Sequence, residues 1–467
     1  MSAAGRGAVS ICHFCLYVWK PNRQPLECQG HLILVEKLPK VTAMELYERW
    51  LETCAKYRDT WAIREEATGQ VWTFGMIESA LNQLPKLEAG RCLPASAQEG
   101  VAGFVLKTLQ AWRDKAVLVP QEKAAALSEE TPAAPCGVVH VKTTSGSTGE
   151  ARRVLFEAGH LVADCAQIQE SMALEKGVPN VAVISVAHSY GFSNLVLPLL
   201  LSGTPLMALN DPLPGTLRRV FAKGGRVTLP AVPAMWRAWH QAGVLRGAQI
   251  ARAITAGAPM PLELEIAIFE QDGLKVHNFY GSSECGGIAY DATETPRASA
   301  ELAGTPMSGV SLKIGTDGCL EVRGAAVARG YDVVCDRLDG GVFRTSDLAR
   351  LEEGCVYLDG RLTDTIHVAG RKVSPQVIEA ALLRHPGVRH CVVFGIASAD
   401  SARVEEIVAC VNTVEDLAPS QLLAGLKDTL PSWQIPRHWW PMQELRPDAR
   451  GKLSRAVWRE RYLKARL

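Results

Sequence analysis

The chain lacks several features that would assign it at once to a common class of protein. No apolar run among its 467 residues is long enough to span a bilayer, and a formal net charge of +1 gives no reason to expect nucleic acid or an anionic membrane as a partner. Internal repeats and low-complexity segments are absent, and so is the G-x-x-x-x-G-K-[ST] motif of P-loop phosphotransferases. With 47% hydrophobic residues, the composition is that of an ordinary globular protein without a membrane span.

The 13 cysteines are scattered through apolar segments without the spacing of a disulfide framework, so we expect a reducing, cytoplasmic location. The apolar stretch Ala8–Trp19 lacks a small-residue cleavage site, which argues against a signal peptide. Four side chains near it have a spacing that is compatible with tetrahedral zinc: Cys12, Cys15, Cys28 and His31. We expect instead that residues 1–33 form a poorly ordered extension.

The length favours two domains, because a single compact core rarely grows to this size. Helical spacing of apolar residues predicts a helix over Ala43–Tyr57, and apolar strands near 181–186, 206–209 and 226–229 alternate with amphipathic helices. This alternation is typical of a layered α/β fold with buried, mostly parallel sheets. We place a large N-terminal domain at 34–360 and a small α/β domain at 361–467, in which Ser374 and Pro375 begin a helix.

A glycine- and hydroxyl-rich segment that follows the apolar run 136–141 says most about function. Glycines allow tight turns, so backbone N–H groups and hydroxyls can converge on an anion. A strand, this loop and then a helix that starts near Ala158 would form a phosphate-binding site. The residues of the loop are Thr144, Ser145, Gly146, Ser147, Thr148 and Gly149.

Four further motifs follow in order along the chain. They are Asn-Phe-Tyr-Gly-Ser-Ser-Glu at 278–284, Phe-Arg-Thr-Ser-Asp-Leu at 343–348, Gly-Arg-Leu-Thr-Asp-Thr-Ile-His-Val-Ala-Gly-Arg-Lys-Val at 360–373, and Gly-Lys-Leu-Ser-Arg at 451–455. From about Leu34 to the C-terminus, the chain resembles the AMP-forming adenylating enzymes, namely acyl- and aryl-CoA synthetases, peptide-synthetase adenylation domains and luciferases. The resemblance implies that a carboxylate attacks the α-phosphorus of ATP and expels pyrophosphate, after which a thiol displaces AMP from the acyl-adenylate.

The resemblance also assigns the adenosine site. The ring of Tyr280 would stack against adenine, and Gly257 and Ala258 would line the other face of the base. Asp347 would accept hydrogen bonds from the ribose hydroxyls, since one carboxylate can accept several. Arg361 would reach the ribose at the junction between the two domains.

The phosphate and catalytic residues are assigned in the same way. The loop 144–149, including Thr148 as a catalytic residue, would hold the β- and γ-phosphates, and Arg152 supplies a cation where the family usually has Lys. Ser283 retains a hydroxyl where Thr is more common, and Glu284 would bind Mg²⁺, for which a carboxylate is a suitable ligand. Lys452 would be the catalytic lysine that offsets the charge on the reacting carboxylate and α-phosphate.

The resemblance further implies that the C-terminal domain is mobile. Thr363 stands at the hinge position, where the family normally has Asp or Lys, and Gly370 lies in the segment that enters the site for the thiol step. The thiol would be that of CoA or of phosphopantetheine on a carrier protein acting in trans.

The segment 188–191 corresponds to the acid pocket. Its residues, together with one glycine further along the chain, are His188, Ser189, Tyr190, Gly191 and Gly281. Amino-acid-activating relatives have an Asp here, so its absence favours an aromatic or medium-chain acyl acid. Two alternatives stay open, a luciferase-like oxygenase and a non-catalytic nucleotide-binding protein. The second would be expected to lose Glu284, Asp347 or Lys452, and all three are present.

Overall fold

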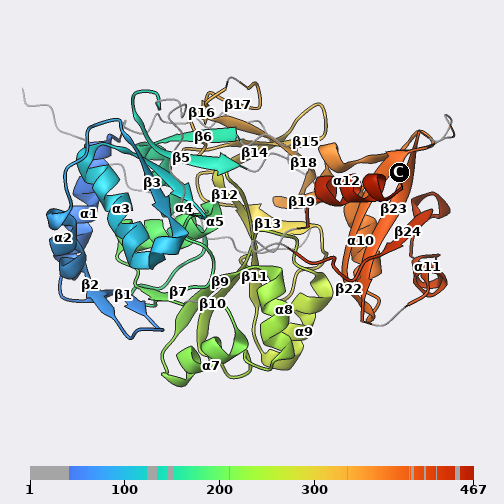
Figure 1. Ribbon diagram of the computed structural model, residues 1–467, viewed down its shortest axis with the longest axis horizontal. Coiled ribbons are helices and arrows are strands. Elements are labelled where there is room, and N and C mark those ends of the chain that lie inside the picture. Colours follow the sequence, from blue (N-terminus) through green and yellow to red (C-terminus); the bar gives the residue numbers. More distant parts are fainter. Residues whose placement is uncertain are drawn as a thin grey trace, which may run out of the picture. The chain divides into compact units, whose positions relative to one another are not determined.

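The computed structural model describes residues 41–123, 134–144, 152–209, 211–333, 335–398, 400, 404–414, 417–427, 429–447 and 453–466 (Figure 1). The predicted N-terminal extension, its four candidate zinc ligands, the loop residues 145–149 and Lys452 lie outside the described residues. Within the described residues, no helix combines the length and the apolar character needed to cross a membrane.

The first half of the large sheet is mainly parallel. Its strands are β1 (Trp61–Glu65), β2 (Val71–Thr73), β7 (Asn180–Ala182), β8 (Leu206–Ala208), β9 (Val227–Ala231), β10 (Ile250–Thr255) and β11 (Val276–Ser282). Among these strands, only the edge pair β1–β2 is antiparallel. The strand predicted near 181–186 is shorter than expected, because β7 ends at Ala182.

The second half of this sheet is antiparallel. Its strands are β12 (Gly286–Tyr290), β13 (Leu302–Pro306), β14 (Ser311–Ile314), β15 (Cys319–Arg323), β17 (Leu338–Asp339), β18 (Val342–Glu352) and β19 (Cys355–Arg361). Among the described residues, fourteen strands join in the order β14-β15-β18-β19-β13-β12-β11-β10-β9-β7-β8-β1-β2, with β17 beside β18. The two halves meet at β11, which pairs in parallel with β10 and antiparallel with β12.

A smaller sheet has the order β16-β6-β5-β4-β3. Its strands are β3 (Cys92–Ser96), β4 (Val117–Gln121), β5 (Val138–Thr144), β6 (Arg152–Glu157) and β16 (Gly330–Tyr331). The predicted arrangement of strand, phosphate loop and helix is wrong in one respect, because β6 follows the loop and pairs antiparallel with β5, with Thr144 opposite Arg152. The helix does begin at Ala158, as predicted, but only after this second strand.

Helices cover both sheets. The ones before β20 are α1 (Ala43–Tyr57), α2 (Phe74–Gln83), η1 (Ala97–Glu99), α3 (Gly100–Asp114), α4 (Ala158–Ser171), α5 (Ser189–Gly191), η2 (Phe192–Val196), α6 (Leu197–Ser202), α7 (Pro214–Ala222), α8 (Pro233–Gln241), α9 (Leu262–Asp272) and η3 (Leu362–Asp364). The bounds of α1 are those predicted. It starts with a capping box between Thr42 and Glu45 and buries Leu46, Trp50 and Cys54 on one face, which explains why apolar spacing located it.

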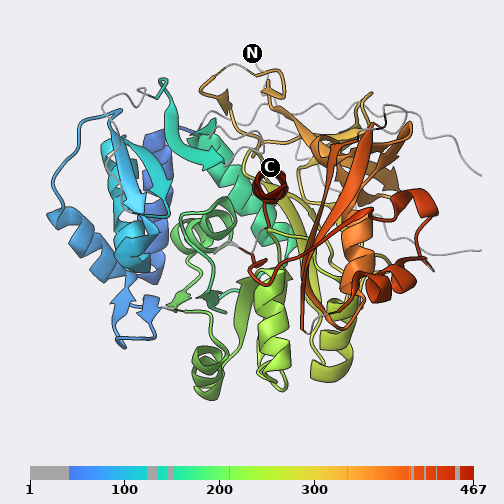
Figure 2. The same ribbon diagram turned by 45° about the vertical axis from the view of Figure 1, so that its right-hand side comes forward.

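The C-terminal elements form a small α/β group, orange to red in Figures 1 and 2. They are β20 (Ile366–Val368), β21 (Arg371–Val373), α10 (Pro375–Leu383), β22 (Val388–Ala397), β23 (Glu405–Thr413), α11 (Pro419–Lys427), η4 (Ser432–Gln434), β24 (His438–Pro441) and α12 (Arg455–Ala465). Ser374 and Pro375 begin α10 as predicted. The α/β class with a small C-terminal α/β unit is therefore confirmed, while the boundary at 360 stays a prediction.

Candidate active site

Three predicted nucleotide-site residues contact one another, although they come from different strands. The hydroxyl of Tyr280 on β11 donates to Oδ2 of Asp347 on β18 at 2.6 Å. Nε of Arg361, at the end of β19, donates to Oδ1 of the same carboxylate at 2.8 Å. The antiparallel register of β18 and β19 places Asp347 directly opposite Arg361, so the backbone fixes this pair. We call Tyr280, Asp347 and Arg361 the ribose cluster, after the role that the family resemblance predicts for them.

The electrostatics of the ribose cluster keep Tyr280 and Arg361 in the forms that donate hydrogen bonds. Burial raises the pKa of Tyr280 well above its usual value, and the Asp347 carboxylate adds to the rise. The Tyr280 hydroxyl therefore stays protonated and remains a donor. The charge of Asp347 also raises the pKa of the Arg361 guanidinium, so Arg361 stays a cation beside the carboxylate.

The predicted adenine segment leaves the sheet beside Tyr280. β10 and β11 are parallel, and their described ladder ends with Thr255 opposite Asn278. Residues 256–258 and 279–280 therefore continue from neighbouring strands at the same edge. Gly257 has φ of +85°, a conformation that side chains rarely adopt, and it is exposed. The backbone can thus turn sharply at the place where Gly257 and Ala258 are predicted to line a base.

Glu284 contacts a residue that the motifs do not contain. The hydroxyl of Tyr331 on β16 donates to Oε1 of Glu284 at 2.9 Å. The guanidinium of Arg152 lies over the same tyrosine ring, 5.6 Å from its centroid, because β16 pairs with β6, which begins at Arg152. Tyr331 therefore connects the residue predicted to bind Mg²⁺ with the cation next to the phosphate loop. It lies 47 residues from Glu284, and no local pattern links the two.

A magnesium ion fits Glu284 only in a particular way. Among the described residues, no group of three or more His, Cys, Asp or Glu side chains could hold a metal ion. Mg²⁺ in nucleotide sites is commonly held by one or two carboxylates together with phosphate oxygens and water. A single partly buried carboxylate such as that of Glu284 is consistent with an ion that arrives with the nucleotide.

Ser189, the second residue of the predicted acid segment, contacts Ser283. The hydroxyls of Ser189 and Ser283 lie 3.1 Å apart. Nε2 of His188 lies 3.1 Å from Oε1 of Glu122, which also accepts a hydrogen bond from Ser185 at 2.7 Å. Glu122 lies beyond the end of β4 and was not foreseen, because nothing in its local sequence distinguishes it from a surface carboxylate.

The next two residues of the acid segment, Tyr190 and Gly191, are held by contacts with other parts of the protein. The Tyr190 hydroxyl donates to the carbonyl oxygen of Ile254 at 3.3 Å, and its ring stacks on Phe279 with centroids 5.7 Å apart. A Cβ added at Gly191 would lie 1.9 Å from the carbonyl oxygen of Ser185, so only glycine fits there. At Gly281 an added Cβ would lie 2.6 Å from the carbonyl oxygen of Gly286. These glycines allow two backbone segments to approach each other closely.

The remaining predicted residues lie at the end of a strand, in a short helix and in a turn. Thr144 is the last residue of β5, and its hydroxyl donates to the carbonyl oxygen of Arg152 at 3.4 Å. Thr363 is the middle residue of η3, directly after the ribose cluster. Gly370 has φ of +78° in the turn between β20 and β21. Their predicted roles in phosphate binding, hinge motion and thiol transfer stay predictions.

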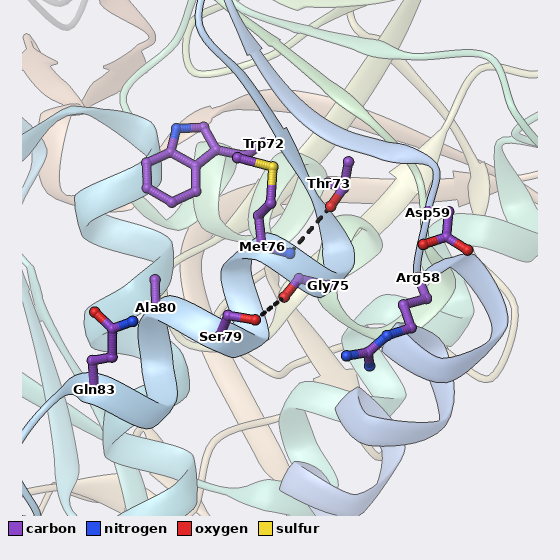
Figure 3. A pocket seen from close by; sticks show the side chains of 9 residues that line it. All are labelled: Arg58, Asp59, Trp72, Thr73, Gly75, Met76, Ser79, Ala80 and Gln83. Atoms are coloured by element: carbon purple, nitrogen blue, oxygen red, sulfur yellow. Dashed lines mark hydrogen bonds between the residues drawn. The ribbon is translucent and has the colours of Figure 1, made fainter.

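A pocket of about 400 Å³ occurs elsewhere, among residues of β2, α2 and the turn that follows α1 (Figure 3). Its lining includes Arg58, Trp72 and Met76, and none of its residues belongs to the predicted site. Two of the polar side chains drawn there have local partners, since the Thr73 hydroxyl accepts from the Met76 N–H and Ser79 donates to the Gly75 carbonyl oxygen (Figure 3). This pocket is therefore no candidate for the nucleotide site.

Comparison with known proteins agrees with the motifs. The chain is 29% identical over 340 residues to a probable 2-succinylbenzoate–CoA ligase of Mycobacterium tuberculosis, covering 68% of this chain and 83% of that protein. It is 28% identical over 356 residues to an anthranilate–CoA ligase of Pseudomonas aeruginosa, covering 71% and 68%. A feruloyl-CoA synthase of an Amycolatopsis species is 25% identical over 371 residues, covering 74% of each chain.

Solved structures share the fold at lower identity. ATP-bound MatB from Rhodopseudomonas palustris superposes with a TM-score of 0.80 at 19% identity and covers 90% of this chain and 99% of its own. The o-succinylbenzoate CoA synthetase MenE from Bacillus subtilis, in complex with the acyl-adenylate intermediate OSB-AMP, has a TM-score of 0.77 at 20% identity and covers 88% and 97%. The arrangement of β-sheets that brings the ribose cluster together is thus shared with proteins of known structure.

The family match itself extends over most of the chain. Residues 377–452 match the C-terminal domain of AMP-binding enzymes, and residues 67–332, more than half of the chain, match the AMP-binding enzymes proper. The resemblance inferred from the five motifs is confirmed, and the chain belongs to the family of AMP-binding enzymes.

Proposed function

We propose that this protein joins a carboxylic acid to a thiol at the expense of ATP. In the first step a carboxylate oxygen bonds to the α-phosphorus, the bond to the β-phosphate oxygen breaks, and pyrophosphate leaves. In the second step the thiol sulfur bonds to the acyl carbon, AMP leaves, and the thiol proton is released. Family membership supports this proposal, and the observation that carries it is the ribose cluster, which offers a carboxylate and a cation at one point.

The ribose cluster would hold the nucleoside while the phosphates react. A carboxylate has about four lone-pair positions, so Asp347 can accept from Tyr280, Arg361 and a ribose hydroxyl together. Glu284 would hold Mg²⁺, which when bound offsets the negative charge of the phosphates. Lys452 would bring a further cation to the carboxylate and the α-phosphate, and positive charge placed there lowers the barrier because charge develops there.

An aromatic acid is the substrate class that we favour. The relatives with the names given above act on 2-succinylbenzoate, anthranilate and ferulate, all of them aromatic acids. The segment 188–191 contains no carboxylate to hold an α-ammonium group, and Glu122, which contacts it, is already engaged by His188 and Ser185. A hydroxyl pair, Ser189 and Ser283, offers weaker and neutral recognition that suits an uncharged ring substituent.

CoA is the acceptor that the relatives' names support, and a carrier-bound phosphopantetheine arm presents the same thiol. The cytoplasmic location stays a prediction from the cysteine content. Thioester formation with CoA alone, in the absence of any carrier protein, would decide between the two acceptors.

Acid-dependent exchange of pyrophosphate into ATP tests the proposal. We expect exchange with benzoates or cinnamates above that with fatty acids, and none with amino acids. Lys452→Ala should lower exchange about a hundredfold or more while a supplied acyl-adenylate still reacts with thiol. The matched control is Lys464→Ala, which removes an exposed lysine paired with Glu460 on α12.

Each rival function has its own outcome in this experiment. Light emission or O₂ consumption with an acyl-adenylate would identify an oxygenase. Nucleotide binding without exchange, for every acid tested, would identify a non-catalytic protein. Strong exchange with an amino acid would contradict the assignment of the acid segment.

A further inference from the structure

Arg455, the first residue of α12, has hydrogen bonds in three directions. Its Nε donates to the carbonyl oxygen of Val393 on β22 at 3.1 Å, and its Nη1 donates to Oδ2 of Asp364 at 2.6 Å. Its Nη2 donates to Oε2 of Glu379 on α10. The side chains of all three charged residues are at most 21% exposed, so the bonds are formed largely away from water. We call Arg455, Asp364 and Glu379 the Arg455 cluster.

The strand β22 also forms hydrogen bonds with the Arg455 cluster. The other carboxylate oxygen of Glu379 accepts from the Val393 N–H at 2.8 Å, so both polar groups of Val393 and both ends of the ion pair are used. A planar guanidinium can form such a fork in fixed directions, and a lysine ammonium cannot reproduce it. The position of Arg455 is therefore determined by contacts on three separate elements, η3, α10 and β22.

The Arg455 cluster lies close in sequence to residues that are predicted to act in the reaction. Asp364 lies three residues after Arg361 of the ribose cluster and directly after the predicted hinge residue Thr363. Arg455 lies three residues after Lys452, which itself is outside the described residues. Between them, Leu453 packs against the apolar cluster that includes Phe394 and Trp458, and Ser454 caps α12 by accepting from the Val457 N–H at 3.4 Å.

We propose that Arg455 is a positioning residue that fastens the chain following Lys452 to the chain following the hinge. The inference rests on the proposed function, because it takes Lys452 as the cation of the first step. Rotation at the predicted hinge, Thr363, would then move Asp364 and the segment 453–455 together as one rigid body, because the hydrogen bonds of Arg455 join them. Two residues, Leu453 and Ser454, stand between Lys452 and the anchored guanidinium, so this anchor would restrict the positions that the lysine can reach.

The two half-reactions separate this role from a merely structural one. As the family resemblance implies, the first step would need Lys452, while the second would use the C-terminal domain in another orientation and would not need this lysine. A general loss of folding in this domain would lower both steps, because both need an intact domain. A loss of positioning near Lys452 would lower the first step and spare the second.

The test compares Arg455→Lys, which keeps the charge without the fork, with Asp364→Asn, which keeps the shape without the charge. The matched control is Arg461→Gln, which removes an ion pair with Glu444 from the exposed side of the same helix. Pyrophosphate exchange and thioester formation from a supplied acyl-adenylate are measured for each protein. Hydrogen–deuterium exchange of the peptide that contains 448–454 gives a readout that is independent of activity.

We expect exchange to fall about tenfold or more in Arg455→Lys, with KM for ATP and the rate of the second step within about twofold of wild type. Asp364→Asn should show the same selective loss to a smaller extent, and the peptide around Lys452 should exchange faster in both variants but not in Arg461→Gln. Equal losses in both steps, or no loss in either, would overturn the inference. If wild-type protein shows no exchange with any acid, the proposed function fails, and unchanged deuterium exchange in both variants would show separately that Arg455 does not anchor this segment.

Discussion

The ribose cluster and the acid segment are predicted to belong to the same site, and the structure holds them in different ways. In the ribose cluster, Tyr280, Asp347 and Arg361 are held by side-chain hydrogen bonds that join residues up to 67 positions apart. In the acid segment, Gly191 is fixed by a close approach of backbone and Tyr190 by a stacked ring and a backbone carbonyl. The first arrangement is built from charged and polar side chains, and the second mainly from close packing.

This difference explains why the nucleotide is easier to infer than the acid. A ribose and a row of phosphates require donors, acceptors and cations, so the chemistry of the ligand limits the residue types. An apolar acid requires a space of the right shape, which many combinations of side chains can provide. The predictions below test whether the two parts of the site really differ in this way.

The largest effect is expected from Gly191→Ala. The added Cβ would lie 1.9 Å from the carbonyl oxygen of Ser185, so the backbone would have to move, at a cost of about 3 kcal/mol in the free energy of unfolding. Urea unfolding measures this cost. Gly215→Ala is the control, because its Cβ would meet nothing within 4 Å on α7, and we expect it to gain up to about 1 kcal/mol. Equal stability of the two variants would show that packing does not fix the acid segment.

Asp347→Asn should impair nucleotide use with little effect on folding. The variant loses the ion pair with Arg361 and weakens the bond from Tyr280, so we expect kcat/KM for ATP to fall about fiftyfold, the value of one or two charged hydrogen bonds. Asp359→Asn on the same hairpin removes only an exposed pair with Arg350 and should stay within about twofold. If the two variants behave alike, the ribose cluster is a surface feature.

Tyr331→Phe tests the residue that the motifs missed. Removing the hydroxyl takes away the donor that orients the Glu284 carboxylate, so we expect about tenfold more Mg²⁺ to be needed for half-maximal exchange, while the ring still supports Arg152. A magnesium titration of pyrophosphate exchange measures this shift. Tyr357→Phe, whose ring carries Arg350 in a similar way, should leave the titration unchanged. An unaltered titration in Tyr331→Phe would remove the link to Glu284.

The smallest effect is expected from Tyr190→Phe. Its hydroxyl donates to carbonyl oxygens at 3.3 and 3.5 Å, which are long hydrogen bonds, so we expect a loss of about 1 kcal/mol in the free energy of unfolding. The order of preference among acids should not change, because the hydroxyl is turned toward the backbone. A changed order in the exchange assay would mean that this hydroxyl contacts the acid, and the contrast between the two parts of the site would be lost.

Local features of the fold were predictable where one physical rule dominates. Helical spacing of apolar residues located α1, and Ala158 was correctly placed at the start of α4. The strand β6 was missed, because the six residues Arg152–Glu157 are too short for alternation to be distinguished from a helix lead-in. Propensity alone gives no hint that Gly330 and Tyr331 pair with this strand across more than 170 residues.

The site was predictable to the extent that its chemistry is carried by motifs. Tyr280, Asp347 and Arg361 were assigned through the resemblance, and their mutual contacts are consistent with that assignment. Tyr331 and Glu122 were not found, because a single tyrosine or glutamate is ordinary in any sequence and gains meaning only from its partner in space. Contacts between distant segments depend on strand order, which no local pattern specifies.

The hairpin of β5 and β6 separates the segment after Thr144 from the start of α4. Thr144 and Arg152 are directly paired between the two strands, so both ends of the connecting segment belong to the same sheet. The first turn of α4 begins six residues after Arg152. The dipole of α4 therefore starts one strand away from these two ends, so a group bound next to Thr144 and Arg152 would not be oriented by that helix.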